Sequence, residues 1–228
     1  MSTIAKVSTT TLRTFPIFET LDNSGLELLV RAAELRNVAR GEEVVHAGDP
    51  TVSIYFVLSG TLRVEVSDDE GREVILCMLG PGEMFGEMGV LDDYERSASV
   101  VAVEPSSLVV IGKAEFKRCL ATNPDVALFI MRDLSRRLRL ADRKIESLAL
   151  LDVYGRVARL LIDMADTVDG MKIVTRKVTK QDIAKMVGAS REMVSRVMRD
   201  LQLQGLILER DGQWVLIDLG RHKALSDY

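Results

Sequence analysis

The sequence predicts an α+β protein in which a β-sandwich or barrel precedes a long helix and a small helical domain with a terminal hairpin. Three observations support this fold class. Turn signals separate short apolar runs between residues 41 and 111, and a strict apolar heptad follows residue 124. Near the end of the chain, two short helical patterns precede an Asp-Gly turn.

Residues 12–39 have a helical pattern. Residues 15–18 are typical of a helix or turn entry. Apolar residues then recur at spacings of three and four, at Leu26, Leu29, Val30 and Ala33. We therefore expect helical structure from residue 12 to residue 39.

Beyond residue 41 the apolar period changes to two, which predicts short strands. Residues 54–58 form a compact apolar run. The alternating apolar residues that follow are Leu62, Val64, Val66, Val74, Leu76 and Met78. Turn signals at residues 47–50, 59–60, 69–71 and 80–82 have the spacing of a β-sandwich or barrel.

A long helix is predicted after Pro124. Its apolar residues alternate at spacings of four and three, which is a coiled-coil heptad. They are Ala127, Met131, Leu134, Leu138, Ala141, Ile145 and Leu148. The pattern predicts a homodimer through a parallel two-stranded coiled coil; the alternative is a long helix that covers the β domain.

The C-terminal part is predicted to contain three helices and a hairpin. A helix over residues 150–167 is broken at 168–170, and shorter helices follow at 179–187 and 190–203. Apolar runs at 207–209 and 214–217 flank residues 210–213, where Asp-Gly indicates a hairpin turn.

Composition excludes several classes of protein. The 228 residues are 47% hydrophobic and 28% charged, which suits two folded domains and excludes disorder. Residues 1–14 are polar, and no stretch is long enough to span a bilayer, so we expect a soluble cytoplasmic protein without a membrane partner. We expect Cys77 and Cys119 to be small buried apolar residues.

Few residues are available for metal or covalent chemistry. The two cysteines lack metal-type spacing and there are two histidines, so we expect no metal, no haem, no iron-sulfur cluster and no catalytic residues. An enzyme of the cupin type would need clustered histidines, and His46 alone does not supply them.

The net charge of −4 conceals an asymmetry. Residues 1–151 carry 17 Lys and Arg against 23 Asp and Glu, whereas residues 152–228 carry 13 against 11. Residues 172–199 contain eight basic and two acidic residues, which gives this segment a net charge of +6. Positive charge concentrated on the short helices indicates double-stranded DNA as a partner.

The two short helices have the pattern of a DNA-reading pair. Thr179 and Ser190 are expected N-caps, and Val194, Val197 and Leu201 a buried stripe. The expected DNA-binding residues are Thr179, Lys180, Ser190, Arg191, Glu192, Ser195, Arg196 and Arg199. Arginine can donate two hydrogen bonds to guanine and Glu192 can accept one from cytosine; the alternative is an ordinary solvated helix face.

These segments resemble a known family. Residues 178–184, 187–192 and 194–197, together with 48–50, 55–60, 85–91 and 96–98, are similar to the cyclic AMP receptor protein family of bacterial transcription regulators. The resemblance covers essentially the whole chain. It implies a jelly-roll-like β-roll that binds a cyclic nucleotide (1–123), a dimerisation helix (124–150) and a winged helix-turn-helix that binds DNA (151–228).

The resemblance also implies partners and roles. RNA polymerase would be a partner, and the operator would be a palindrome of TGTGA-like half-sites. Arg191, Glu192 and Arg196 would read the bases. Another class of function stays open, in which a nucleotide-binding module of this kind regulates a protein partner.

A glycine-rich turn followed by Arg-Ser is a candidate effector site. Exposed backbone N–H groups, a guanidinium and a hydroxyl suit a cyclic phosphate, and a carboxylate suits a ribose hydroxyl. By resemblance, Glu87 binds ribose, and Arg96 with Ser97 binds phosphate. The expected residues in this segment are Gly86, Glu87, Met88, Arg96 and Ser97. The alternative is a structural ion pair between Glu87 and Arg96.

The long helix departs from the family pattern. Ala141 and Asp142 stand where the cyclic AMP receptor protein has a Thr-Ser pair that contacts adenine. Arg139 and Asp142 lie three residues apart on one helix face and resemble motifs that bind the guanine of cyclic di-GMP. Cyclic AMP and cyclic di-GMP both remain open as effectors.

Overall fold

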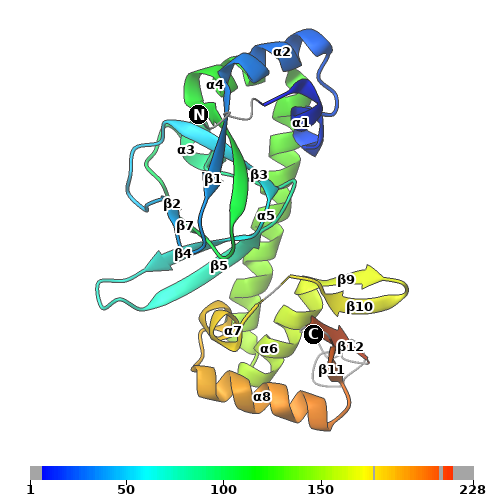
Figure 1. Ribbon diagram of the computed structural model, residues 1–228. Helices are drawn as coiled ribbons and strands as arrows, with labels where there is room; N and C mark the ends of the chain where they lie inside the picture. The colour runs from blue at the N-terminus through cyan, green and yellow to red at the C-terminus, as the bar shows by residue number, and fades with distance from the viewer. Residues whose placement is uncertain (1–6, 177, 211–212, 218–228) are drawn as a thin grey trace. The chain divides into compact units, whose positions relative to one another are not determined.

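The computed structural model describes residues 7–176, 178–210 and 213–217, and the chain divides into two compact units, residues 1–136 and 137–228. The division falls inside one helix, α5 (Pro124–Leu150), which is unbroken in Figure 1. The predicted domain limits after residues 123 and 150 stay predictions.

Two four-stranded antiparallel sheets form the body of the first unit. One has the strand order β1-β8-β3-β6 and the other β2-β7-β4-β5. The strands are β1 (Ala33–Val38), β2 (Glu43–Val45), β3 (Ser53–Ser59), β4 (Leu62–Ser67), β5 (Glu73–Leu79), β6 (Met84–Phe85), β7 (Ser99–Ala102) and β8 (Ser106–Gly112). The predicted β-roll is confirmed.

Helices pack on the first of these sheets around an aromatic cluster. They are α1 (Thr9–Arg13), the 3-10 helix η1 (Pro16–Phe18), α2 (Asn23–Ala32), α3 (Glu87–Asp92), α4 (Lys113–Thr122) and the start of α5. The ring of Phe56 on β3 lies 5.3 Å from Phe15, 5.0 Å from Phe18 and 6.0 Å from Phe116, between centroids. All four rings are fully buried.

The expected helix from residue 12 to residue 39 is wrong at its C-terminal end. Residues Ala33–Val38 are strand β1, which pairs with β8 from Ala33 opposite Ile111 to Val38 opposite Ser106. The helical spacing of the apolar residues ends at Ala33. Pairing with the distant strand β8 then satisfies the backbone of residues 33–38.

The predicted strand through Val74, Leu76 and Met78 is β5, but these three residues do not all face the core. Val74 and Leu76 are each 43% exposed, whereas Ile75 is buried. A register irregularity between Val64 and Glu65 of β4 shifts the facing residues of β5. Such a bulge reverses which side chains face the core. Cys77 is exposed on this strand, contrary to expectation, and Cys119 is buried as expected.

The second unit combines three helices with a four-stranded sheet of order β11-β12-β10-β9. Its elements after α5 are α6 (Val153–Met164), β9 (Ala165–Val168), β10 (Met171–Val174), α7 (Lys180–Val187), α8 (Arg191–Leu203), β11 (Ile207–Arg210) and β12 (Gln213–Leu216). The predicted short helices and the terminal hairpin are confirmed, although Asp211 and Gly212 of its turn lie outside the described residues.

The predicted helix over residues 150–167 ends early. Ala165–Val168 is strand β9, and it forms a hairpin with β10 across Asp169 and Gly170 (Figure 1). Both turn residues have positive φ, +49° and +79°, as a two-residue hairpin turn requires. Asp-Gly therefore starts a new hairpin here as well as breaking a helix.

Among the described residues, no helix has both the length and the apolar character that crossing a membrane requires.

We expect Phe56→Ala to lower the free energy of unfolding of the first unit by about 3–5 kcal/mol, because it removes the ring at the centre of the aromatic cluster. Urea unfolding followed by circular dichroism measures the loss. Leu28→Ala is the control, since Leu28 is 67% exposed and its loss should change stability by less than about 0.5 kcal/mol. Equal effects of the two variants would contradict the central role of Phe56.

Candidate functional site

The predicted effector segment is built around two glycines at helix α3. Gly86 precedes the helix with a φ of +78°, and a Cβ there would collide with the Arg96 guanidinium. A Cβ on Gly89 would collide with the Thr51 hydroxyl and the Tyr94 carbonyl oxygen. Sterics therefore require glycine at both positions of the motif.

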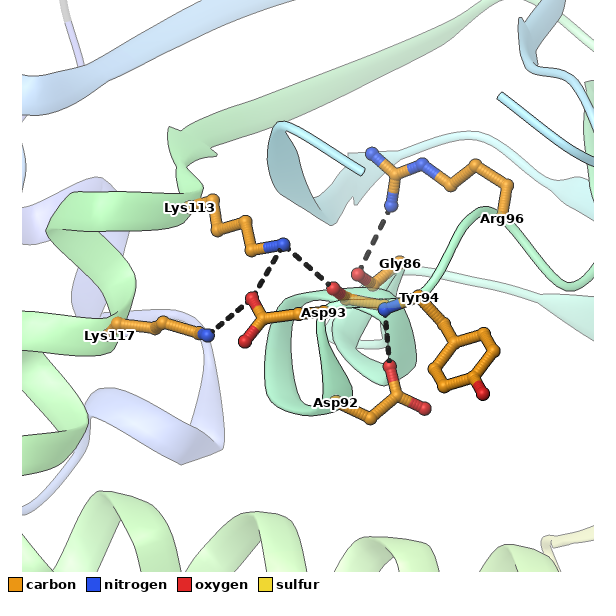
Figure 2. Close-up of polar contacts among 8 residues, drawn as sticks. Gly86, Asp92, Asp93, Tyr94, Arg96, Lys113 and Lys117 are labelled. Carbon is orange, nitrogen blue, oxygen red and sulfur yellow. Dashed lines mark hydrogen bonds and ion pairs between the residues drawn. The ribbon is translucent and has the colours of Figure 1, made fainter. Parts of the chain in front are cut away.

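The Arg96 guanidinium is buried beneath this turn, where Figure 2 shows it directed at Gly86. Its Nη1 donates to the Gly86 carbonyl at 3.1 Å and its Nη2 to the Ser53 carbonyl at 2.7 Å. It also lies 5.5 Å above the ring of Tyr55, which stacks on Phe85. Burial lowers the pKa of Arg96, and the charge of Glu87 opposes this shift.

The other predicted residues of the segment differ in their exposure. The side chain of Glu87 is buried, and those of Met88 and Ser97 are exposed. The Ser97 hydroxyl donates to the Met88 sulfur at 3.9 Å. The fold thus brings together Gly86, Glu87, Met88, Arg96 and Ser97, which we name the cassette.

A turn from a distant part of the sequence fixes the backbone of Arg96. The Gly48 N–H donates to the Arg96 carbonyl and the Arg96 N–H to the Asp49 carbonyl, each at 2.9 Å. The turn at Gly48 was predicted, but its contact with the cassette was not. Ser53 and Tyr55 were also missed, because their only sequence signal is membership of a strand.

Arg139 and Asp142 lie on the part of α5 that belongs to the second unit. Both side chains are exposed. Their spacing of three on an α-helix puts them on the same side, as predicted.

Helix α7 begins with a complete capping box. The Asp182 N–H donates to the Thr179 hydroxyl oxygen at 3.1 Å, and the Thr179 N–H donates to the Asp182 carboxylate at 2.9 Å. Two backbone donors that the helix leaves unpaired are thereby satisfied. Gly188 ends the helix in the left-handed conformation with a φ of +63°.

Helix α8 starts three residues later and turns its apolar side inward. Its N-cap Ser190 accepts from the Met193 N–H at 3.2 Å. The predicted stripe of Val194, Val197 and Leu201 is buried, together with Met198. The short turn and both caps have the arrangement of a helix-turn-helix.

The opposite side of α8 carries the predicted DNA-binding residues. Arg191, Glu192, Arg196 and Arg199 are exposed, and Ser195 is half-buried. Within the described part of the chain, no ion pair engages Arg191, Arg196 or Arg199. Three guanidinium groups are therefore available to an anionic partner. Lys177, part of the predicted basic segment, lies outside the described residues.

Residues 7–176, 178–210 and 213–217 contain no cluster of possible metal ligands. No three His, Cys, Asp or Glu side chains are grouped there so that they could hold a metal ion. Burial raises the pKa of the Cys119 thiol to about 11, which keeps it protonated at neutral pH.

Both halves of the chain match known protein families. Residues 35–123 match the cyclic nucleotide-binding domain and residues 155–225 match the Crp-like helix-turn-helix domain. The chain belongs to the cyclic AMP receptor protein family. Members of this family that resemble it are named as transcriptional regulators and not as enzymes.

Two relatives in this family illustrate the similarity. The cAMP-activated global transcriptional regulator CRP of Haemophilus influenzae is 38% identical over 171 residues, 72% of this chain and 75% of the relative. The cAMP-activated regulator Vfr of Pseudomonas aeruginosa is 35% identical over 192 residues, 80% and 88% of the two chains.

Solved structures of the family have the same fold. The c-di-GMP responsive global regulator CLP of Xanthomonas campestris superposes with a TM-score of 0.69 at 30% identity, covering 86% of this chain and 99% of that one. Together these matches make this family member a DNA-binding transcription regulator with a cyclic nucleotide-binding domain.

We expect Thr179→Ala to destabilise the second unit by about 1–2 kcal/mol, because it removes the hydroxyl of the capping box. Denaturant unfolding can be followed by the fluorescence of Trp214, the only tryptophan in the sequence and a buried residue of this unit. Gln181→Ala, an exposed change in the same helix, is the control and should cost less than about 0.5 kcal/mol.

Proposed function

We propose that the protein is a homodimer that binds palindromic, TGTGA-like operators under the control of a cyclic nucleotide, either cyclic AMP or cyclic di-GMP. The observation that carries the effector part is the buried Arg96 guanidinium at the glycine turn. A buried cation beside the first backbone N–H groups of α3 suits the phosphate of such a ligand.

Base reading is assigned to one face of α8. Arg191 and Arg196 each have the fork of donors that matches guanine O6 and N7, and Glu192 can accept from cytosine N4. Contacts with the phosphate backbone of the DNA are assigned to the neighbouring hydroxyl and cationic side chains. These are Thr179, Lys180, Ser190, Ser195 and Arg199.

Phosphate recognition is assigned to Arg96 and Ser97, and ribose recognition to Glu87. Arg96 has five N–H donors, so its bonds to Gly86 and Ser53 leave others for the ligand. Gly86 and Met88 contribute the backbone of the turn.

The choice of nucleotide depends on α5. Relatives from H. influenzae and P. aeruginosa are named as cAMP-activated, and the X. campestris structure is that of a c-di-GMP responsive regulator. Ala141 lacks the hydroxyl expected for adenine, whereas Asp142 with Arg139 offers an acceptor and a donor pair suited to guanine. Both effectors stay in the proposal.

The proposed dimer forms through the heptad of α5. Met131, Leu138, Ile145 and Leu148 are between 55% and 65% exposed in the single chain. Burying such a seam against a second copy would remove this apolar surface from water. RNA polymerase is the proposed further partner of the DNA-bound dimer.

Effector binding is tested by calorimetry with cyclic AMP, cyclic GMP and cyclic di-GMP. We expect one of them to bind, Arg96→Ala to weaken its binding at least about tenfold, and Asp142→Ala to weaken only a guanine ligand. Because Arg96 is buried, its variant needs an unchanged circular dichroism spectrum for the comparison to count. No heat from any nucleotide would contradict the effector proposal.

DNA reading is tested with Arg196→Ala. We expect it to lower the preference for a TGTGA-like operator over random DNA about tenfold or more, since a bidentate guanine contact is worth about 1–3 kcal/mol. Affinity should also fall log-linearly with salt. Arg118→Ala removes an exposed arginine of α4 that pairs with Glu115, and it should leave the preference unchanged. An equal effect of both variants would contradict the assignment.

A further inference from the structure

Two lysines of α4 hold the C-terminal end of the cassette helix α3 (Figure 2). Lys113 and Lys117 are four residues apart, so they lie on the same side of α4. Their Nζ atoms are 2.8 Å and 2.6 Å from the same oxygen, Oδ1 of Asp93. Lys113 also donates to the Gly89 carbonyl, inside α3, at 3.2 Å.

Asp93 is well suited to this arrangement. It follows the last residue of α3 in the left-handed conformation, with a φ of +64°, which aspartate and asparagine tolerate better than most residues. Lys113 and then Lys117 lower the pKa of Asp93 to about 2. The Asp93 carboxylate is therefore ionised throughout the neutral pH range.

Helix α3 needs such support because it is only six residues long. A helix of that length is unstable by itself in water. Arg96 binds the Gly86 carbonyl at its start, and Val90 packs in the apolar core at its middle. The two lysines bind its end. These three contacts help to fix the position of Glu87 and Met88, which α3 carries.

The same helix α4 leads directly into α5. The Asn123 side chain between them donates from Nδ2 to the Cys119 carbonyl at 2.9 Å. Val126 and Ile130, at the start of α5, are buried in the same core cluster as Val90 of α3 and Phe116 of α4. A shift of α3 would therefore affect α4 through the ion pairs and α5 through the shared apolar core.

We propose that Lys113, Lys117 and Asp93 form a clamp that positions the cassette for its effector and ties it to α4. These are positioning residues, since none of them is assigned a contact with the nucleotide. The clamp rests on the proposed effector function, because the benefit of positioning α3 is tighter nucleotide binding.

The main test is Asp93→Asn, which keeps shape and backbone preference and removes the charge. Calorimetry with cyclic AMP, cyclic GMP and cyclic di-GMP compares it with the natural protein. We expect the dissociation constant of whichever nucleotide binds to rise about fivefold, the upper range for a partly exposed ion pair. Lys113→Met should weaken binding more than Lys117→Met, because Lys113 also holds Gly89.

Controls separate positioning from general stability. Arg118→Met removes a cation from the same helix that pairs with Glu115 instead of α3, and it should leave nucleotide affinity unchanged. Lys113→Arg keeps a cation at this position, so its dissociation constant should lie within about twofold of that of the natural protein. The double variant Asp93→Asn with Lys113→Met should raise the dissociation constant by less than the product of the two single effects, because both changes remove the ion pair between Lys113 and Asp93.

Hydrogen exchange of residues 86–95 in the nucleotide-free protein provides a second readout. Asp93→Asn should speed exchange in this segment and leave β4 and β5 unchanged. If a nucleotide binds and these variants bind it like the natural protein, the clamp is wrong and the effector proposal stands. If no nucleotide binds, the effector proposal is wrong, and unaltered exchange in Asp93→Asn would then overturn the clamp as well.

Discussion

The buried guanidinium of Arg96 is the constraint around which the first unit is organised. A charge removed from water needs polar partners, and here the Gly86 and Ser53 carbonyls supply them. Gly86 must lack a side chain to leave room for it, and β3 must place Ser53 and Tyr55 on the correct side. The glycine motif, the strand and the arginine therefore depend on one another.

Helix α8 is positioned differently, by local contacts that leave one of its faces exposed. The capping box at Thr179 and the cap at Ser190 satisfy the first backbone donors of α7 and α8. The apolar residues of α8 are buried in the core of the second unit. Its arginines are then exposed without an ion pair to any described residue, so no internal partner competes with phosphate or guanine.

Control of one unit by a ligand of the other requires two states with different affinities for that ligand. The contacts of α3 show how such a difference can arise. A short helix held by separate groups at its start, middle and end has little stability of its own, so binding at its start can change its position relative to α4. Helix α5, which begins in this core and continues into the second unit, is the covalent path between the two units.

The sequence by itself determined what depends on neighbours in the chain. Period, caps and turn residues are local, so α7, α8, the terminal hairpin and the order of the two domains were predictable. The glycine motif likewise identified the cassette. Strand β1, the hairpin at Asp169 and the exposure of Val74 were not predictable, because pairing between strands overrides local preference.

Only the tertiary structure decided which distant residues complete each site. Ser53 reaches Arg96 and Asp49 pairs with its backbone, and Asp93 meets Lys113 and Lys117 across 20 or more residues of chain. No spacing in the sequence marks these contacts. They exist because the packing of the sheets and helices brings these groups within hydrogen-bonding distance.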